Sequence, residues 1–198
     1  MPMDYYGMED SPLAVIAGIW GLWIVSWFIA ALWAARTQAR PPLGSQTLYR
    51  IITLVGVAAL FDQWGGYRGN DVTQLWTLSP TLSGVMIALT AAGFSFCWWA
   101  RIYLGRLWSS SVTRKEDHHI VDTGPYALVR HPIYTGIIVA SAATAAVRGT
   151  VASLVGLALV ILGCWIKARL EERFLRSELG ADAYDRYASR TGMLFPFL

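Results

Sequence analysis

The 198-residue chain has few charged side chains: Asp, Glu, Lys and Arg make up 15% of it, whereas 55% is hydrophobic. A soluble domain carries about a quarter of its residues as charged side chains, so this composition argues for a membrane protein. Cysteine is also scarce. The two cysteines, Cys97 and Cys164, lie inside apolar runs, which excludes a disulfide framework and a CxxC metal site. We expect both thiols to be small buried hydrophobic groups.

Two familiar sequence signals are missing as well. The N-terminal stretch MPMDYYGMED is acidic and lacks the basic region of a cleavable signal peptide, so we expect the first apolar run to be retained as a helix. A Gly-rich GxGxxG segment is also missing. A dinucleotide pocket of the Rossmann type is therefore not expected.

Long uncharged runs predict membrane-spanning helices, because about 20 apolar residues cross a hydrocarbon core about 30 Å thick. Three runs reach this length and two are shorter. The long runs are 13–35, 81–100 and 149–166, and the shorter ones are 51–61, extended to 48–64, and 132–147. The sequence therefore predicts an all-α, polytopic integral membrane protein with about five transmembrane helices. We divide it into an N-terminal two-helix membrane region, 1–80, and a functional core, 81–198.

The basic residues predict how these helices are oriented. If the N-terminus lies outside, the inner segments 36–50, 101–130 and the residues after 166 hold three, five and six of the 16 Lys and Arg residues. Only Arg68 and Arg148 then lie outside. The positive-inside rule thus predicts an N-out, C-in topology, with the functional segments facing the cytosol. We expect the membrane to be a bacterial inner membrane.

The chain becomes polar after the fifth apolar run. From Lys167 onward it is rich in oppositely charged pairs at helical spacing, so we expect the fifth span to continue into the cytosol as one helix to about Leu179. Gly180 is then its C-cap. A shorter amphipathic helix with Tyr184 and Tyr187 follows, and residues 195–197, Phe-Pro-Phe, are expected to return to the membrane surface.

The segment 105–136, GRLWSSSVTRKEDHHIVDTGPYALVRHPIYTG, contains all three histidines of the chain. Pro132 suits the first turn of a helix, whose free N–H groups and dipole favour an anionic group nearby. Arg130 and His131 come directly before it. The plainer alternative is that Arg130 anchors the chain at the interface and His131 is a neutral residue in a polar cap. A metal site from the residues His118, His119, Asp122 and His131 matches no established ligand spacing, so no metal is expected.

Three blocks in order carry a family resemblance: LG-x-x-W-S at 104–109, E-x-H-x-I-V-x-x-G-P-Y-x-x-V-R-H-P-x-Y-x-G at 116–136, and E-E-R-x-L-x-x-x-x-G-x-x-x-Y-x-x-Y at 171–187. With apolar spans between them, they resemble the isoprenylcysteine carboxyl methyltransferase family, whose relatives include membrane phospholipid and small-thiol methyltransferases. The resemblance covers roughly the C-terminal half of the chain. The stretch 117–119, Asp-His-His, departs from the family, which more often has a glycine before a single histidine, and we assign His119 no role.

The resemblance implies S-adenosyl-L-methionine as the cofactor, held in a cytosolic pocket between the loop after the third span and the C-terminal helices. The cofactor-binding residues that it implies are His118, Val121, Gly124, Tyr126, Arg130, His131, Pro132, Tyr134, Glu171 and Glu172. Lys167 and Arg169 are candidates for orienting an anionic acceptor, with interface anchoring as the alternative.

The chemistry of these side chains fits that cofactor. Its carboxylate suits Arg130, His131 or a helix N-terminus, and its ribose hydroxyls suit a carboxylate such as Glu171 or Glu172. Its adenine suits the face of Tyr126 or Tyr134. By itself the Glu171–Glu172 pair is better explained as a solvated helix face, and only together with the RHP block does it favour ligand binding.

We therefore expect an S-adenosylmethionine-dependent methyltransferase acting on a lipophilic acceptor, such as a prenylcysteine-type carboxylate. Its partners are then lipophilic or lipidated substrates and membrane lipids, without nucleic acid. A phospholipid amine or a small thiol is an alternative acceptor. A membrane reductase that uses NADPH is a second function, and a scaffold or small transporter is a third. A transport path usually needs ionisable residues at mid-depth, and the spans have almost none.

Overall fold

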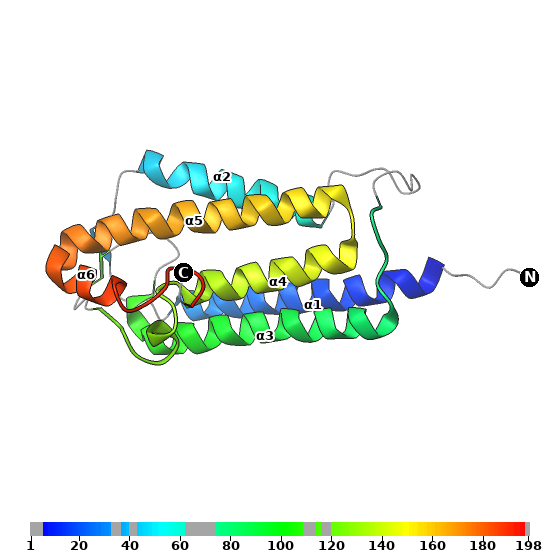
Figure 1. Cartoon of the computed structure of the whole chain (residues 1–198), viewed down its shortest axis with the longest axis horizontal. Coiled ribbons are helices and arrows are strands. Elements are labelled where there is room, and N and C mark those ends of the chain that lie inside the picture. Colours follow the sequence, from blue (N-terminus) through cyan, green and yellow to red (C-terminus); the bar gives the residue numbers. More distant parts are fainter. Residues whose placement is uncertain are drawn as a thin grey trace, which may run out of the picture.

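A computed structural model describes residues 6–32, 37–39, 43–61, 74–108, 114–115 and 120–196. It is built from helices that run side by side along one direction (Figure 1). The helices are α1 (Tyr6–Ala31), α2 (Leu43–Leu60), α3 (Pro80–Leu104), α4 (Pro132–Arg148), α5 (Val151–Leu179) and α6 (Ala181–Ala188), with the short 3-10 turns η2 (Gly105–Leu107) and η3 (Gly124–Ala127). Two short strands, β1 (Thr37–Ala39) and β2 (Arg114–Lys115), pair antiparallel.

Three of the helices are long and apolar enough to cross a membrane: Pro12–Ala31, Pro80–Leu107 and Val151–Glu178. Two others, Gln46–Leu60 and Pro132–Arg148, are apolar but shorter. The all-α class and the three long runs are thus confirmed, and the two weaker runs are helices whose length does not by itself establish a span. These helices are typical of a multi-pass membrane protein. The N-out, C-in orientation and the division at residue 80 stay predictions.

The second helix differs most from its predicted bounds. It was expected at 51–61, extended to 48–64, but α2 begins at Leu43. Two polar side chains in the first half of this helix are buried: Gln46 is 1% exposed and Tyr49 is 4% exposed. A hydropathy run misses such a start because Gln46 and Arg50 interrupt the apolar sequence, although packing buries the helix there.

Glycines bring α3 and α4 into close contact. A Cβ atom on Gly93 would lie 2.7 Å from the carbonyl oxygen of Gly136, and a Cβ atom on Gly136 would collide with the Gly93 carbonyl and the Cys97 thiol. The contact between α2 and α5 is built in the same way around Gly56 and Gly156. Small residues of this kind let helix backbones approach closely in lipid, where packing replaces the hydrophobic effect as the driving force.

Aromatic side chains join α1 to the rest of the bundle. The rings of Trp23 and Phe94 stack with their centroids 4.5 Å apart, and Trp20 meets Phe94 edge-on at 4.8 Å. The Trp20 indole also donates to Thr144 Oγ1 at 3.1 Å. Helix α1 therefore packs on α3 and α4, whereas α2 packs on α5, so that the N-terminal helices flank the core on two sides.

The α4–α5 pair forms a tight helical hairpin, as the adjacent apolar runs 132–147 and 149–166 allow. Gly149 adopts a left-handed conformation, φ 60°, and Thr150 caps α5 through reciprocal hydrogen bonds with Ser153. At the other end, α5 continues as one helix to Leu179 and stops at Gly180, whose φ is 97°. The end of α5 confirms the prediction, and both helices end at a glycine because it accepts positive φ without a Cβ clash.

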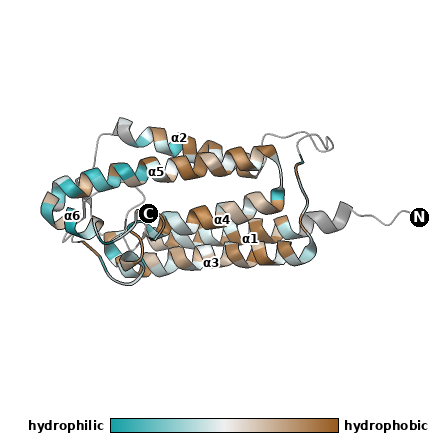
Figure 2. Ribbon diagram, viewed as in Figure 1, coloured by the Kyte–Doolittle hydropathy of each residue, from teal (hydrophilic) through white to brown (hydrophobic). Residues whose placement is uncertain are grey.

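The two ends of the bundle differ in composition. The beginning of α1 and the α4–α5 turn lie at one end, and η3, α6 and the C-terminal segment lie at the other (Figure 1). Figure 2 shows hydrophobic residues along most of the bundle and hydrophilic residues along the second half of α5 and α6. The charge-free part of α5 ends before Lys167, so the polar end of the bundle begins there. The candidate site lies at this end.

Candidate cofactor site

The site forms where α4 begins beside the polar half of α5. His131 is the N-cap residue of α4 and Pro132 its first residue, so the residues 129–131 lead directly into the helix. Gly124, φ 57°, opens the η3 turn that precedes them, and a Cβ atom there would collide with the Tyr103 ring. The turn thus packs tightly on α3 and fixes the approach of the chain to α4.

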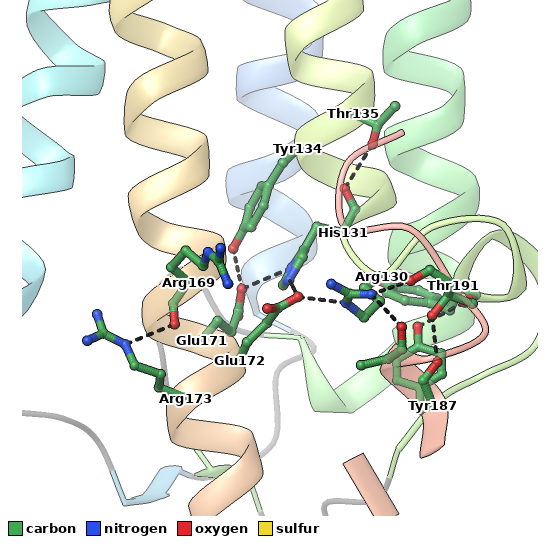
Figure 3. Close-up of polar contacts among 12 residues, drawn as sticks. Arg130, His131, Tyr134, Thr135, Arg169, Glu171, Glu172, Arg173, Tyr187 and Thr191 are labelled. Carbon is green, nitrogen blue, oxygen red and sulfur yellow. Dashed lines mark hydrogen bonds and ion pairs between the residues drawn. The ribbon is translucent and has the colours of Figure 1, made fainter. Parts of the chain in front are cut away.

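The two adjacent carboxylates of α5 both face His131. Its Nε2 atom lies 3.3 Å from Glu172 Oε1, and its Nδ1 atom lies 3.6 Å from Glu171 Oε2 (Figure 3). The histidine side chain is 7% exposed, and Glu171 and Glu172 are 23% and 12% exposed. One imidazole ring therefore bridges both carboxylates, and Glu171 is the more accessible of the two.

Tyr134, one turn into α4, completes this group. Its hydroxyl donates to Glu171 Oε2 at 2.5 Å, and its ring stacks on His131 with the planes 9° apart and the centroids 5.2 Å apart. The spacing of three residues puts the two rings on one face of the helix. The stacked pair and the two carboxylates form a surface that combines flat rings with hydrogen-bond acceptors.

Arg130 connects the carboxylates to the C-terminal part of the chain. Its Nε donates to Glu172 Oε1 at 2.7 Å, and its Nη1 donates to the carbonyl oxygens of Ala188, at 3.0 Å, and Thr191. The Arg130 side chain is 13% exposed. A planar guanidinium can hold several acceptors at fixed angles, so this residue joins three segments of the chain at one point.

The tyrosines of η3 and α6 are uncharged. Burial raises the pKa of Tyr126, Tyr184 and Tyr187 well above the usual value. The Tyr187 hydroxyl donates to the Tyr126 carbonyl oxygen at 2.8 Å, which fastens α6 to η3. These phenols stay protonated in the physiological range, and the Tyr187 hydroxyl acts as a structural hydrogen-bond donor.

The two cations predicted to orient an acceptor lie in different surroundings. Lys167 Nζ is 5.1 Å from the Tyr134 ring centroid and 5.6 Å from that of Tyr49, so it lies between α4 and α2. The Arg169 guanidinium is instead on an exposed side chain and lies 5.6 Å from the Trp165 ring. Of the two, only Lys167 contacts a residue of the candidate site through these interactions.

The structure brings together five of the ten predicted cofactor residues: Arg130, His131, Tyr134, Glu171 and Glu172. Pro132 starts α4 beside them. Val121, Gly124 and Tyr126 lie on the preceding loop and the η3 turn, where Tyr126 is buried. His118 falls outside the described residues.

Sequence reasoning missed the C-terminal segment. The backbone N–H groups of Arg130 and His131 donate to the carbonyl oxygens of Gly192 and Met193, at 2.9 and 3.1 Å. The sequence analysis made no prediction for Gly192 and Met193, and expected only residues 195–197 to return to the membrane surface. The contacts are between backbones, so they leave no pattern of side chains that could reveal them.

Metal ligands do not gather in the described part of the chain: no group of three or more His, Cys, Asp or Glu residues there could hold a metal ion. The two carboxylates that face His131 instead accept hydrogen bonds from Arg130, at Glu172, and from Tyr134, at Glu171. Each carboxylate thus accepts from a guanidinium or a phenol as well as facing His131.

Comparison with known protein families identifies the region that carries this site. Residues 86–177 match the sequence model of the isoprenylcysteine carboxyl methyltransferase (ICMT) family. This region of the chain belongs to the ICMT family. The ICMT region runs from α3 through α4 to the polar half of α5, and so includes every member of the Arg130, His131, Tyr134, Glu171 and Glu172 group. It begins after α2 and ends before α6.

Two curated proteins are similar over a longer stretch. The chain is 28% identical over 156 residues to the nickel-cobalt-cadmium resistance protein NccN of Alcaligenes xylosoxydans xylosoxydans, covering 76% of this chain and 64% of that protein. It is 33% identical over 153 residues to the cobalt-zinc-cadmium resistance protein CzcN of Cupriavidus metallidurans, covering 75% and 61%. The chain therefore spans less than two thirds of the length of each relative.

Proposed function

We propose that this protein is an integral membrane methyltransferase that uses S-adenosyl-L-methionine and methylates a lipophilic acceptor. The observation that carries the proposal is the convergence of Arg130, His131 and Tyr134 on Glu171 and Glu172. This group lies at the polar end of an apolar bundle, within the ICMT region. Family membership supports methyl transfer as the class of reaction.

The residues of the site fit the cofactor. Glu171, the more exposed carboxylate, would accept hydrogen bonds from the ribose hydroxyls, with Glu172 beside it. The stacked rings of His131 and Tyr134 offer a face for the adenine, and a π-face is also favourable to a cationic sulfonium. When bound, the cofactor supplies an activated methyl group. The protein then has to align the acceptor with it and exclude water.

Lys167 is the residue that we propose for orienting the acceptor. It precedes Glu171 by four residues on α5, so the two side chains share a face about 6 Å apart along the helix. The same side chain lies between the rings of Tyr134 and Tyr49. An anionic head group beside Lys167 would thus come close to the carboxylates that hold the cofactor.

This geometry favours a carboxylate acceptor, such as that of a prenylcysteine, over the alternatives. An ionised carboxylate attacks without losing a proton, whereas a phospholipid amine or a thiol must first be deprotonated by a base. Its charge also matches the cation at Lys167. We propose that the lipophilic part of the acceptor lies among the apolar helices, because these offer it an environment like the bilayer.

The names of the two relatives favour a second candidate function, a part in resistance to divalent metals. Methylation removes the negative charge of a carboxylate, and fewer negative charges at a membrane surface attract fewer divalent cations. Titration of the purified protein with Ni²⁺, Co²⁺, Zn²⁺ and Cd²⁺ distinguishes this indirect effect from direct metal binding by the protein. Saturable metal binding would argue for a direct role of the protein in metal handling instead of methyl transfer.

The decisive experiment is calorimetric titration of the detergent-solubilised protein with S-adenosylhomocysteine, the demethylated cofactor, beside NADPH. We expect saturable binding of the S-adenosyl compound, weakened in His131→Ala and Glu172→Ala. The exposed residue Asp185 pairs with Arg176 away from the site, so Asp185→Asn is a matched control that should bind as the wild type does. If NADPH binds and the S-adenosyl compound does not, the protein is a reductase and the proposal is wrong.

A radiolabelled methyl group then identifies the acceptor class. Incubation with labelled cofactor and a farnesylcysteine analogue should produce a methyl ester, which releases volatile methanol on treatment with base. Methyl groups on a phospholipid amine or a thiol survive that treatment. Label that is stable to base would therefore move the assignment from a carboxylate to one of these acceptors.

A further inference from the structure

The last part of the chain lies along the residues that open α4. We name residues 189–196 the C-terminal strap. The N–H groups of Arg130 and His131 donate to the strap carbonyls of Gly192, at 2.9 Å, and Met193, at 3.1 Å. Val129 and Gly192 form a parallel bridge. The strap therefore pairs like a short strand with the residues that carry two members of the candidate site.

Side-chain contacts extend this pairing into α4. Thr135 Oγ1 donates to the Leu194 carbonyl oxygen at 2.6 Å. The Leu194 side chain is 6% exposed and belongs to a buried cluster with Tyr134 and Ile138. The strap is thus packed against the residue whose hydroxyl contacts Glu171.

Arg130 ties the strap to the carboxylates. One of its nitrogens donates to the carbonyl oxygens of Ala188, the last residue of α6, and of Thr191 in the strap, and another donates to Glu172. Glu172 Oε1 also meets His131. A displaced strap would take the Thr191 acceptor from Arg130 and allow the guanidinium to pull Glu172 away from His131.

We propose that the C-terminal strap is a working part of the cofactor site and that Arg130 is a positioning residue that acts through it. The docked strap holds Arg130, and Arg130 holds Glu172 in line with His131 and the cofactor. This assignment differs from the expectation that Arg130 binds the carboxylate of the cofactor. It rests on the proposed function, since the positioned group is the one proposed to bind S-adenosylmethionine.

A coupling of this kind is reciprocal. If the docked strap strengthens cofactor binding, the bound cofactor must stabilise the docked strap by the same factor. Hydrogen exchange measures this in the wild-type protein, because the amides of Arg130 and His131 are protected by strap carbonyls. We expect S-adenosylhomocysteine to slow exchange in a peptide that contains these two amides and in one from the strap.

Two ligands separate positioning from direct contact. S-adenosylhomocysteine has the amino acid carboxylate, and 5′-methylthioadenosine lacks it but keeps the adenosine and the sulfur. If Arg130 acts through the strap, Arg130→Lys weakens binding of both ligands by the same factor. If Arg130 instead contacts the carboxylate, the substitution weakens only S-adenosylhomocysteine, and the proposal is overturned.

Strap variants test the same idea without touching the site. Thr135→Val removes the bond to Leu194, and Leu194→Ala removes its buried side chain. Each should weaken binding of both ligands. For Thr135→Val the expected loss is about two- to tenfold, as for one hydrogen bond. Asp185→Asn is the control and should bind normally. Unfolding temperatures within the range of the control exclude general loss of structure as the cause.

The outcomes distinguish the two proposals. Wild-type protein that binds neither nucleoside refutes the proposed function, and the strap inference with it. Wild-type protein that binds S-adenosylhomocysteine while both strap variants bind it equally well refutes the strap inference alone. Exchange at Arg130 and His131 that is unchanged by a saturating ligand also refutes it. Slower exchange together with equal losses for the two ligands would support the strap as part of the site.

Discussion

Replacement of Glu172 by glutamine tests the central contact of the site. The substitution keeps the shape of the side chain and removes its charge. In the structure, Glu172 Oε1 accepts from Arg130 Nε at 2.7 Å and lies 3.3 Å from His131 Nε2, with Arg130 and Glu172 13% and 12% exposed. The guanidinium would then face a neutral amide inside a mostly buried pair.

The expected loss follows from the strengths of hydrogen bonds. A bond to a charged group contributes about 1.5–3 kcal/mol and a neutral one about 0.5–1.5 kcal/mol. The glutamine oxygen can keep the neutral share, so Glu172→Gln should cost about 1–2 kcal/mol of the free energy of unfolding. For a protein of this size, each kcal/mol shifts Tm by about 2–4 °C. The expected fall in Tm is therefore about 2–8 °C.

Thermal unfolding in detergent, followed by tryptophan fluorescence, measures this shift, since the chain has ten tryptophans. Glu171→Gln is the matched comparison, because Glu171 is more exposed and accepts from the neutral Tyr134 hydroxyl. We expect it to lower Tm less. Arg176→Gln breaks an exposed ion pair, whose partners are 54% and 52% exposed, and should leave Tm unchanged.

Two outcomes would contradict this role of the Arg130–Glu172 pair. If Glu172→Gln unfolds at the wild-type temperature while Glu171→Gln unfolds earlier, the Arg130–Glu172 pair does not hold the site together. If instead Glu172→Gln and Arg176→Gln lower Tm equally, the buried pair has no greater weight than an exposed one.

Substitutions at three further positions have defined outcomes. Gly136→Val should prevent close packing on Gly93 and either lower Tm or abolish stable expression. A Tm near that of the wild type would contradict this packing. Lys167→Met should raise KM for an anionic acceptor and leave cofactor affinity unchanged, whereas Lys167→Arg should retain most of the activity. A loss of cofactor affinity in calorimetry would contradict the role of Lys167 in orienting the acceptor. Tyr134→Phe removes the hydroxyl 2.5 Å from Glu171 but keeps the ring, and should weaken S-adenosylhomocysteine binding by about two- to tenfold. Unchanged binding would separate that hydroxyl from the site.

The long helices and their ends could be predicted because their causes are local. An uncharged run of membrane length determines a helix wherever it lies in the chain, as for α1, α3 and the first part of α5. The end of α5 at Gly180 and the turn at Gly149 follow from the freedom of glycine to adopt positive φ. The start of α2 could not be predicted in this way, since burial of Gln46 depends on packing rather than on hydropathy.

For the candidate site, the sequence predicted which residues take part, and the tertiary structure decided what each one contacts. Three motifs in order were enough to predict the ICMT family and to single out His131, Tyr134 and the two glutamates. Forty residues separate His131 from Glu171, so only the packing of α4 beside α5 brings the imidazole and the carboxylates together. The strap is a still clearer case. Its contacts with Arg130 and His131 use backbone carbonyls, which every residue possesses, so the sequence holds no sign of them until the chain is folded.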